Sequence, residues 1–315
     1  MPGSLPLALR GQPAARRPAA GVWRSRLGAL LTPVAIWVPL LIAAGHVVLF
    51  TVWTTWISFT ASKLVPDNAL VGVRNYRVVM RTANFQIAYT NLVIYGLGFV
   101  ALATVVGLLL AILLDQRVRG ENVLRAIFLY PLAVSFVVTG TVWSWLLNPG
   151  LGIQKLVNDL GWTSFRFDWV VQQDMAIYTL IIAATWQAAG FAMALFLAGL
   201  RSVDGDLIKA AQIDGAGPWR TYRRVVLPTL WPIFITVLVI LLQFAIKTFD
   251  LVRALTGGGP GISTTLPALV VYDFMFQRGE LGRGSAAAVL MLLSLVVVLA
   301  PYGIFVRWQR RRRQA

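Results

Sequence analysis

Six long apolar stretches constrain this 315-residue sequence more than any other feature. A helix needs about 20 apolar residues to cross the hydrocarbon core of a bilayer. Backbone groups have no water to bond inside lipid, and the alternating pattern of a barrel strand is missing, so these stretches must be helices. We therefore predict an all-α integral membrane protein with six transmembrane helices. The expected spans are residues 33–59, 88–114, 126–147, 175–200, 228–252 and 285–306.

The composition agrees with a lipid environment for most of the chain. Hydrophobic residues make up 58% of the sequence and charged residues only 13%, whereas soluble domains are about one quarter charged. The net charge of +16 comes without the aromatic-basic motifs of a nucleic-acid binder, so we expect a lipid bilayer and no nucleic acid as partner. The absence of cysteine and the single histidine, His46, argue against disulfides and against a thiolate or histidine metal site.

The distribution of basic residues predicts the orientation. Eighteen of the 28 Lys and Arg residues fall in the two terminal segments and in the loops on the same side, against nine in the loops opposite. Because basic residues accumulate on the cytoplasmic side, both termini are expected to be cytoplasmic. The Pro-, Ala- and Arg-rich segment 1–28 is predicted to be a disordered basic arm, residues 29–306 the transmembrane domain, and residues 307–315 a basic tail.

The predicted cytoplasmic loop 201–227 carries signals for two short helices. Asp204 stands where a carboxylate suits a helix N-terminus. Gly215 and Gly217 would end the first helix, and Pro218 is suited to the first position of a second one. Such a hairpin could dock into a groove of another protein or lie on lipid headgroups as an amphipathic segment.

The stretch "KAAQIDGAGPWRTYRRVVLP", Lys209 to Pro228, resembles the EAA loop of binding-protein-dependent ABC importer permeases, which reads E-A-A-x-x-D-G-A and later I-x-L-P. The resemblance implies a coupling helix that sits in a cleft of a cytoplasmic ATPase. Lys209 replaces the glutamate of the pattern, which is a reversal of charge. The matching residues are Ala210, Ala211, Asp214, Gly215, Ala216, Val225, Leu227 and Pro228.

Two further stretches narrow the family to the carbohydrate-uptake group, which includes maltose- and glucose-type permeases. "KTFDLVRALTGGGPG" begins at Lys247 and "FQRGELGRGSAAAVLM" at Phe276, and both resemble segments of that group. The best match is to glucose or mannose permeases, although maltose-type and glycerol-phosphate permeases share much of this region. The glycine run is not a Walker A loop, because the required G-K-[ST] is missing. It is expected to form a turn or a re-entrant loop.

The resemblance also implies the partners. The chain would be a permease subunit and not an enzyme, with no cofactor of its own, while ATP and Mg²⁺ would bind to two cytoplasmic ATPase subunits. A second, different permease would complete a heterodimer, and an external binding protein would deliver the sugar. The expected location is the bacterial cytoplasmic membrane.

Polar and aromatic residues inside the spans are candidates for the substrate path. A ring for stacking beside an amide or hydroxyl suits a neutral sugar, although polar residues also join helices to one another. The family resemblance points to Gln187, Phe191, Phe244 and Thr248, which form two i, i+4 pairs on helix faces. Lys247 and Asp250 are expected near the outer boundary, paired or reaching the headgroups. The complete candidate set is Trp186, Gln187, Phe191, Gln243, Phe244 and Thr248.

Two other classes of protein remain to be weighed. A self-sufficient secondary transporter or channel predicts an inverted repeat, helices broken at mid-membrane or paired titratable groups. A membrane scaffold without transport predicts a sealed bundle with no polar path. The sequence displays none of the first set, and the folded loop would have no purpose in either class.

Overall fold

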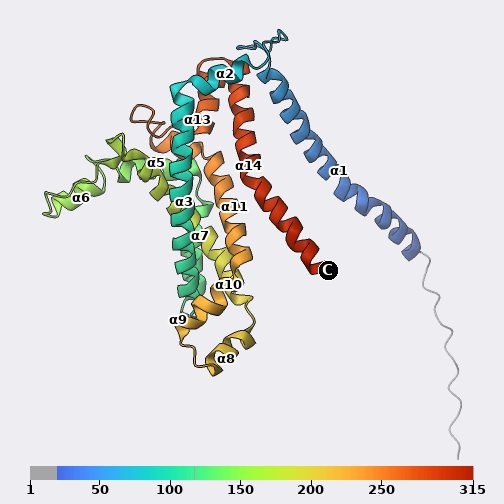
Figure 1. The fold of residues 1–315 in the computed structure, drawn as a ribbon, viewed down its shortest axis with the longest axis vertical. Coiled ribbons are helices and arrows are strands. Elements are labelled where there is room, and N and C mark those ends of the chain that lie inside the picture. The colour runs from blue at the N-terminus through green and yellow to red at the C-terminus, as the bar shows by residue number, and fades with distance from the viewer. Residues whose placement is uncertain (1–19, 117, 315) are drawn as a thin grey trace, which may run out of the picture. The chain divides into compact units, whose positions relative to one another are not determined.

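The computed structural model describes the backbone of residues 20–116 and 118–314, and the chain divides into two units, residues 1–53 and 54–315 (Figure 1). Helix α1 (Ala20–Ser58) makes up the described part of the first unit, and its last turn belongs to the second. Residues 1–19 of the predicted disordered arm lie outside the described residues. Residues 20–28 belong to α1, where no proline follows Pro18 to interrupt the helix before the first span.

The regular secondary structure of the second unit is helical. Among the described residues, one isolated β-bridge joins Thr60 and Leu70. The α-helices are α2 (Arg74–Arg81), α3 (Ala83–Asp115), α4 (Glu121–Ala133), α5 (Phe136–Leu146), α6 (Ile153–Asp159), α7 (Ala176–Arg201), α8 (Gly205–Ile213), α9 (Pro218–Thr221), α10 (Leu227–Thr229), α11 (Trp231–Lys247), α12 (Asp250–Leu255), α13 (Pro267–Tyr272) and α14 (Leu281–Gln314). A 3₁₀ turn covers Trp169–Val171, and π-helical turns cover Tyr222–Val226 and Asp273–Gln277.

Four of the six predicted spans appear as continuous helices. Segment Trp37–Ser58 of α1, all of α3 and α7, and segment Leu281–Gly303 of α14 are long and apolar enough to cross a membrane. The other two predicted spans, 126–147 and 228–252, are not straight helices, and each belongs to a bent pair. Broken helices, expected above for a self-sufficient transporter, are therefore present here. They do not distinguish such a transporter from an ABC importer permease.

The predicted span 126–147 is broken between α4 and α5, which meet at 98°. Val134 has an extended backbone, and the Ser135 side chain caps α5 by accepting a hydrogen bond from the Val137 N–H at 3.3 Å. Pro131 inside α4 also lacks a backbone donor for the helix. Hydropathy registers the apolar run but not a serine cap within it, so the structure has a bent pair here instead of one straight helix, and the crossing of this pair as a single span stays a prediction.

The predicted span 228–252 is broken at both ends. Segment Pro218–Thr229 meets α11 at 65°. At the other end, Thr248 has an extended backbone, and its hydroxyl donates to the Phe244 carbonyl at 2.8 Å, so α11 stops at Lys247 and α12 begins two residues after Thr248. The straight helix assumed from hydropathy is thus three pieces.

Helices α3 and α7 pack closely along the centre of the second unit. A side chain at Gly107 of α3 would meet the Ala192 side chain and the Met193 backbone nitrogen of α7. Ala183, Ala188 and Ala192 are buried along α7. Small residues let two helix backbones approach in a membrane protein, and this explains why an alanine-rich helix occupies the core.

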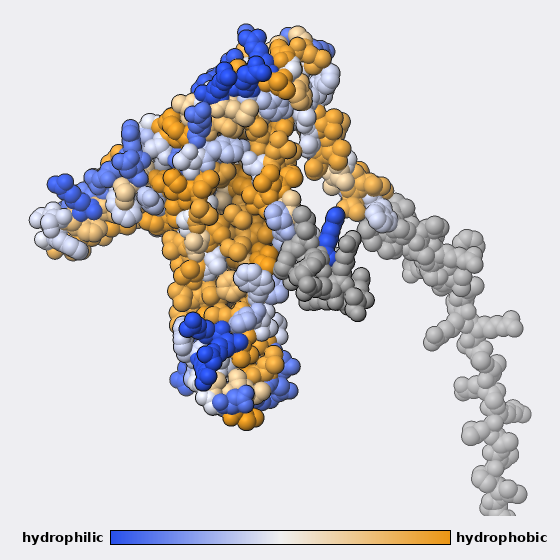
Figure 2. All heavy atoms as spheres, viewed as in Figure 1, coloured by the Kyte–Doolittle hydropathy of each residue, from blue (hydrophilic) through white to orange (hydrophobic). Residues whose placement is uncertain are grey.

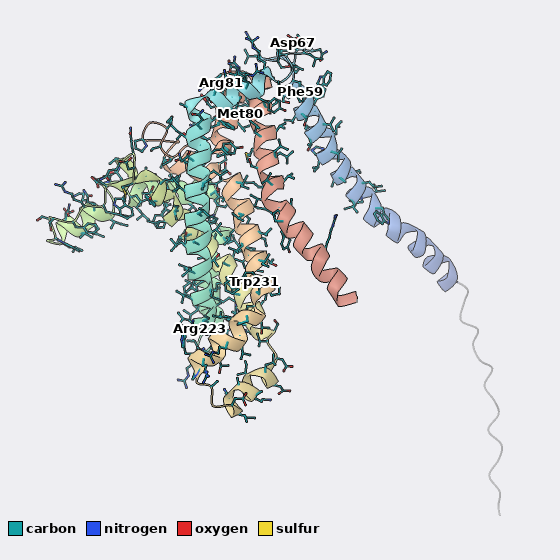
Figure 3. All side chains as sticks on the ribbon, viewed as in Figure 1. Phe59, Asp67, Met80, Arg81, Arg223 and Trp231 are labelled. Carbon is teal, nitrogen blue, oxygen red and sulfur yellow. The ribbon has the colours of Figure 1, made fainter. Side chains whose placement is uncertain are left out.

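Polar surface collects at opposite ends of the second unit. Figure 2 shows hydrophilic residues around α8 and α9 at one end and around α2 at the other, with apolar surface between them. Arg223 lies toward the first end, near the start of α11, and Arg81 lies at the second (Figure 3). This banding is the arrangement expected of helices that cross a bilayer.

The glycine run after α12 forms a turn, as the sequence predicted. Gly257, Gly258 and Gly261 all have positive φ, a backbone region that glycine occupies without strain. Thr264 donates to the Gly259 carbonyl at 2.8 Å, and the Asn91 amide of α3 donates to two carbonyls just after the turn. The turn is therefore ordered by hydrogen bonds within the loop and from α3.

Candidate functional site

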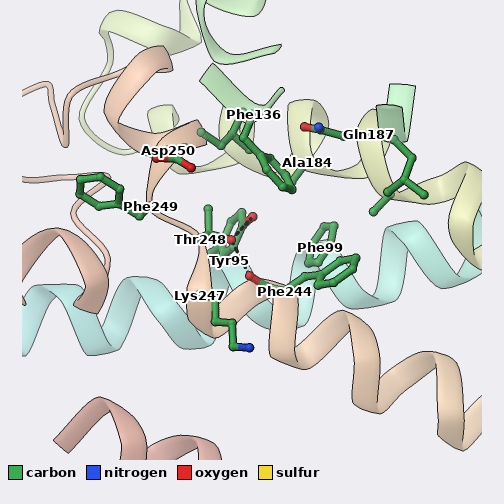
Figure 4. A pocket seen from close by; sticks show the side chains of 13 residues that line it. Tyr95, Phe99, Phe136, Ala184, Gln187, Phe244, Lys247, Thr248, Phe249 and Asp250 are labelled. Carbon is green, nitrogen blue, oxygen red and sulfur yellow. Dashed lines mark hydrogen bonds between the residues drawn. The ribbon is translucent and has the colours of Figure 1, made fainter. Parts of the chain in front are cut away.

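A cavity of about 230 Å³ lies between α3, α7 and the two broken helices (Figure 4). Such a cavity has room for a small solute. The lining residues are Tyr95, Phe99, Leu132, Phe136, Ala184, Gln187, Ala188, Phe244, Lys247, Thr248, Phe249, Asp250 and Leu251.

Gln187 contributes the most buried polar group to this cavity. Only 2% of the residue is exposed. Its Nε2 donates to the carbonyl of Val134, the residue between α4 and α5, at 2.8 Å. Its Oε1 is buried and accepts no hydrogen bond from any described residue. A buried amide oxygen without a donor is costly, and this acceptor lacks a donor among the described residues.

Tyr95 and Thr248 form the second polar element. The Thr248 hydroxyl donates to the Phe244 carbonyl, so the Tyr95 hydroxyl donates to Thr248 Oγ1, at 3.1 Å. Aromatic rings surround this pair, with the Tyr95 and Phe99 rings nearly parallel and their centroids 5.7 Å apart. The cavity therefore combines ring faces with a hydroxyl and an amide.

The structure brings together three of the six predicted path residues. Gln187, Phe244 and Thr248 line the cavity. Phe191 packs against the Phe244 ring, with centroids 5.8 Å apart, and is not among the lining residues. Trp186 is 43% exposed and packs edge-on against Trp143. Gln243, which is half-buried, is not among the lining residues.

Several lining residues were not singled out in the sequence. Tyr95 and Phe99 are one helical turn apart on α3, and this i, i+4 spacing was the available signal. Phe136 belongs to α5 and reaches the cavity only because of the bend. Lys247 and Asp250, which the sequence placed near the outer boundary either paired or reaching the headgroups, also line the cavity. No ion pair joins them to each other or to another described residue, so the paired alternative is absent.

The loop predicted for coupling folds as the local signals indicated. Asp204 caps α8 by accepting from the Asp206 N–H at 2.9 Å. Gly215 follows α8 with φ of +74°, the left-handed conformation that ends many helices. Pro218 begins α9. The two-helix hairpin is thus confirmed, whereas its role in coupling stays a prediction.

One surface of this hairpin is open. Helix α8 has no buried residue. Beside it, Ile213 is 87% and Trp219 76% exposed. Lys209 forms an ion pair with Asp206 at 2.9 Å, and both side chains are largely exposed. Large apolar side chains on a polar end of the molecule mark a contact surface.

The other surface of the hairpin is fixed to α3. Tyr222 donates to Asp115 Oδ2 at 2.9 Å, and Gln116 Nε2 donates to the Tyr222 hydroxyl at 3.2 Å. Burial and the neighbouring Asp115 carboxylate raise the pKa of Tyr222 to about 12. The hydroxyl therefore keeps its proton, and its role as donor, throughout the physiological range. Nearby, Glu121 at the start of α4 accepts from Arg201 at 2.6 Å.

Comparison with known proteins identifies the family. The model of the binding-protein-dependent transport system inner membrane component matches residues 103–314. A probable ABC transporter permease protein of Pyrococcus horikoshii is 38% identical over 268 residues, covering 84% of this chain and 92% of that protein. This chain therefore belongs to the binding-protein-dependent ABC transporter permeases and is a multi-pass membrane protein.

Further relatives place it among the sugar-type permeases. The trehalose/maltose transport system permease protein MalF of Thermococcus litoralis is 32% identical over 265 residues, covering 83% of this chain and 89% of that one. The xylose/arabinose import permease protein XacH of Haloferax volcanii is 34% identical, covering 75% of each chain. The chain is thus a carbohydrate-uptake ABC permease.

Solved structures support the fold. A bacterial ABC transporter involved in the import of the acidic polysaccharide alginate has a TM-score of 0.73 at 21% identity, covering 91% of this chain and 99% of that chain. The same kind of transporter has been solved with an alginate pentasaccharide-bound periplasmic protein, with a TM-score of 0.69 over 89% of this chain and 93% of that one. At this identity, the likeness concerns the fold alone.

Proposed function

We propose that this chain forms the translocation path for a neutral sugar, with glucose or mannose as the best candidate, in an ATP-driven importer of the bacterial cytoplasmic membrane. Both termini would be cytoplasmic and the two bent pairs would count as spans, giving six in all. The cavity carries the proposal. Aromatic faces for the C–H surfaces of a sugar lie beside Gln187, whose buried Oε1 needs a donor.

The partners follow from the same proposal. Two ATPase subunits would bind ATP and Mg²⁺, and their cleft would receive α8 with the exposed Ile213 and Trp219. A second, different permease would complete a heterodimer, and an external binding protein would deliver the sugar. Closure of the ATPase pair would move the hairpin, and the spans would change from inward-facing to outward-facing.

Uptake of labelled sugars into cells that lack only this chain tests the proposal. The panel is glucose, mannose, maltose, trehalose and glycerol 3-phosphate, with redundant carriers removed. We expect the intact chain to restore uptake of one sugar. A Gly215→Trp chain should reach the membrane without restoring uptake, because the bulky residue occupies a backbone at positive φ in the docking hairpin.

The sugar assignment and the coupling role of the hairpin can fail separately. If uptake of all five solutes is independent of the chain, the sugar assignment is wrong. If the Gly215→Trp chain restores uptake fully, the hairpin does not couple the permease to the ATPase.

A further inference from the structure

An acidic side chain, Asp250, lies at the cavity within the membrane-spanning region. By helical rise, Tyr95 is about 18 Å from the Ala83 end of α3, a helix about 50 Å long. With α3 centred on the roughly 30 Å of bilayer hydrocarbon, Tyr95 lies in the half nearer Ala83, which is the outer half in the proposed orientation. Asp250 is two residues from Thr248, which Tyr95 contacts, so it lies within about 7 Å of that level. An ionisable residue at such a depth is a candidate for function.

The carboxylate of Asp250 has no partner that would explain it as a structural group. No described residue forms an ion pair or a hydrogen bond with it. Lys247, the nearest cation along the chain, points away from Asp250 and Thr248 in Figure 4. The position at the start of α12 makes a negative charge tolerable, but leaves both carboxylate oxygens free to accept.

Apart from the Lys247 ammonium group, the polar side chains of the cavity lining offer acceptors or have their protons already in use. The Gln187 Oε1 is buried without a donor, and the Thr248 and Tyr95 hydroxyl protons are already used toward Phe244 and Thr248. Asp250 adds two more acceptor oxygens. The charges of Lys247 and Asp250, which both line the cavity, offset each other, and the accepting oxygens suit a solute that brings several hydroxyl donors.

We propose that Asp250 is a specificity-determining residue of the cavity, accepting a hydrogen bond from a hydroxyl of a neutral sugar. This inference rests on the proposed function and adds a residue for which the sequence suggested only a surface role. The Gln187 oxygen would accept from a second hydroxyl of the same solute.

Deoxy sugars provide the test, in cells that carry the complete transporter with this chain replaced by variants. Initial uptake of labelled glucose and of its 2-, 3-, 4- and 6-deoxy analogues is measured for wild type, Asp250→Asn and the matched control Asp174→Asn, an exposed aspartate outside the cavity lining, per amount of chain in the membrane. Because the external binding protein is the same throughout, its own preference cancels when variants are compared.

Asp250→Asn should lower glucose uptake about tenfold, the fold-change that one charge-assisted hydrogen bond carries. For one deoxy analogue the loss should be less than about twofold, since the hydroxyl that Asp250 bonds is already gone. Asp174→Asn should change each rate by less than twofold. Equal losses for glucose and every analogue, or no loss, overturn the proposal.

Other outcomes are also decisive. If the Asp250→Asn chain does not reach the membrane, Asp250→Glu keeps the charge and lengthens the side chain, and an unchanged ranking of the deoxy analogues then overturns the proposal. If maltose uptake, and not glucose uptake, depends on the chain, the glucose assignment fails and Asp250→Asn must lower maltose uptake where Asp174→Asn does not. If glycerol 3-phosphate is the solute transported, both proposals fall.

Discussion

The continuous helix pair α3 and α7 differs sharply from the broken helices α4/α5 and α11/α12 around the same cavity. The continuous pair packs through Gly107 and a run of alanines, with backbones in near contact. The broken helices are held by hydrogen bonds from side chains, such as Gln187 to the Val134 carbonyl. The first pair forms a rigid frame. At the breaks, backbone groups such as the Val134 carbonyl bond to side chains, whereas in an intact helix they would bond within the helix.

A steric change in the continuous pair should have the largest effect. Gly107→Ala would place a methyl group against the α7 backbone, and this overpacking should lower the free energy of unfolding by about 3 kcal/mol. Gly96→Ala, on the same helix but only in ordinary contact with Ala245, should be neutral or slightly stabilising. Thermal unfolding of the purified chains in detergent compares them, and equal melting temperatures would contradict the close packing.

Removal of the hydrogen bond at the α4/α5 break should come next. Gln187→Leu leaves the Val134 carbonyl without its donor, at a cost of about 2 kcal/mol. Gln243→Leu is the matched control, because Gln243 is half-buried and outside the cavity lining. Protease protection of the α4/α5 segment measures the effect. If both variants are cleaved alike, Gln187 does not hold the bend.

Loss of the contact between the hairpin and α3 should lower the stability less than the two changes above. It should also change how much ATP is hydrolysed for each sugar imported. Tyr222→Phe removes a hydrogen bond to Asp115 worth about 1 kcal/mol, and should raise the ATP hydrolysed per sugar imported by the reconstituted transporter. Tyr89→Phe, which loses a hydroxyl contact with Ser294, is the control for a tyrosine outside the hairpin. The same ratio in both variants would exclude a role of Tyr222 in coupling.

The pH dependence of the Tyr222 contribution follows from its raised pKa of about 12. A phenol whose pKa is higher in the folded than in the unfolded chain stabilises fully below its ordinary value of about 10, and this contribution disappears as the pH rises through about 12. The stability difference between wild type and Tyr222→Phe should therefore be constant across neutral pH and shrink only in strong alkali.

The smallest effect is expected at Lys209. Its ion pair with Asp206 joins side chains that are 73% and 83% exposed, and such pairs contribute less than about 0.5 kcal/mol. Lys209→Glu, which restores the residue of the family pattern, should leave the melting temperature unchanged. A loss of several degrees would mean that the pair stabilises α8 more than its exposure implies.

Local signals explain what the sequence could predict. The α8 hairpin depends on Asp204, Gly215 and Pro218, which act within a few residues, and α7 is a single apolar run. The break after Ala133 could not be predicted in this way, since the apolar composition is the same for a straight and a bent span. Its donor, Gln187, is 53 residues away in the sequence.

The cavity was predictable only in part for the same reason. Gln187, Phe244 and Thr248 lie on helices that flank the hairpin, and the family resemblance pointed to them. Tyr95 and Phe136 come from α3 and α5, where no motif marks them. They reach the cavity through the packing of the whole bundle, which the spacing of residues along one helix does not encode.

The unbroken length of α3 has a mechanical consequence. Asp115 holds the hairpin through Tyr222, and Tyr95 on the same helix holds Thr248 at the cavity. These two points are 20 residues apart, a rod of about 30 Å with no joint in it. The route along the chain itself, from Tyr222 to Thr248, passes through the 65° bend before α11. A push delivered to the hairpin therefore reaches the cavity as a rigid displacement through α3, whereas the route through α11 absorbs it by flexing.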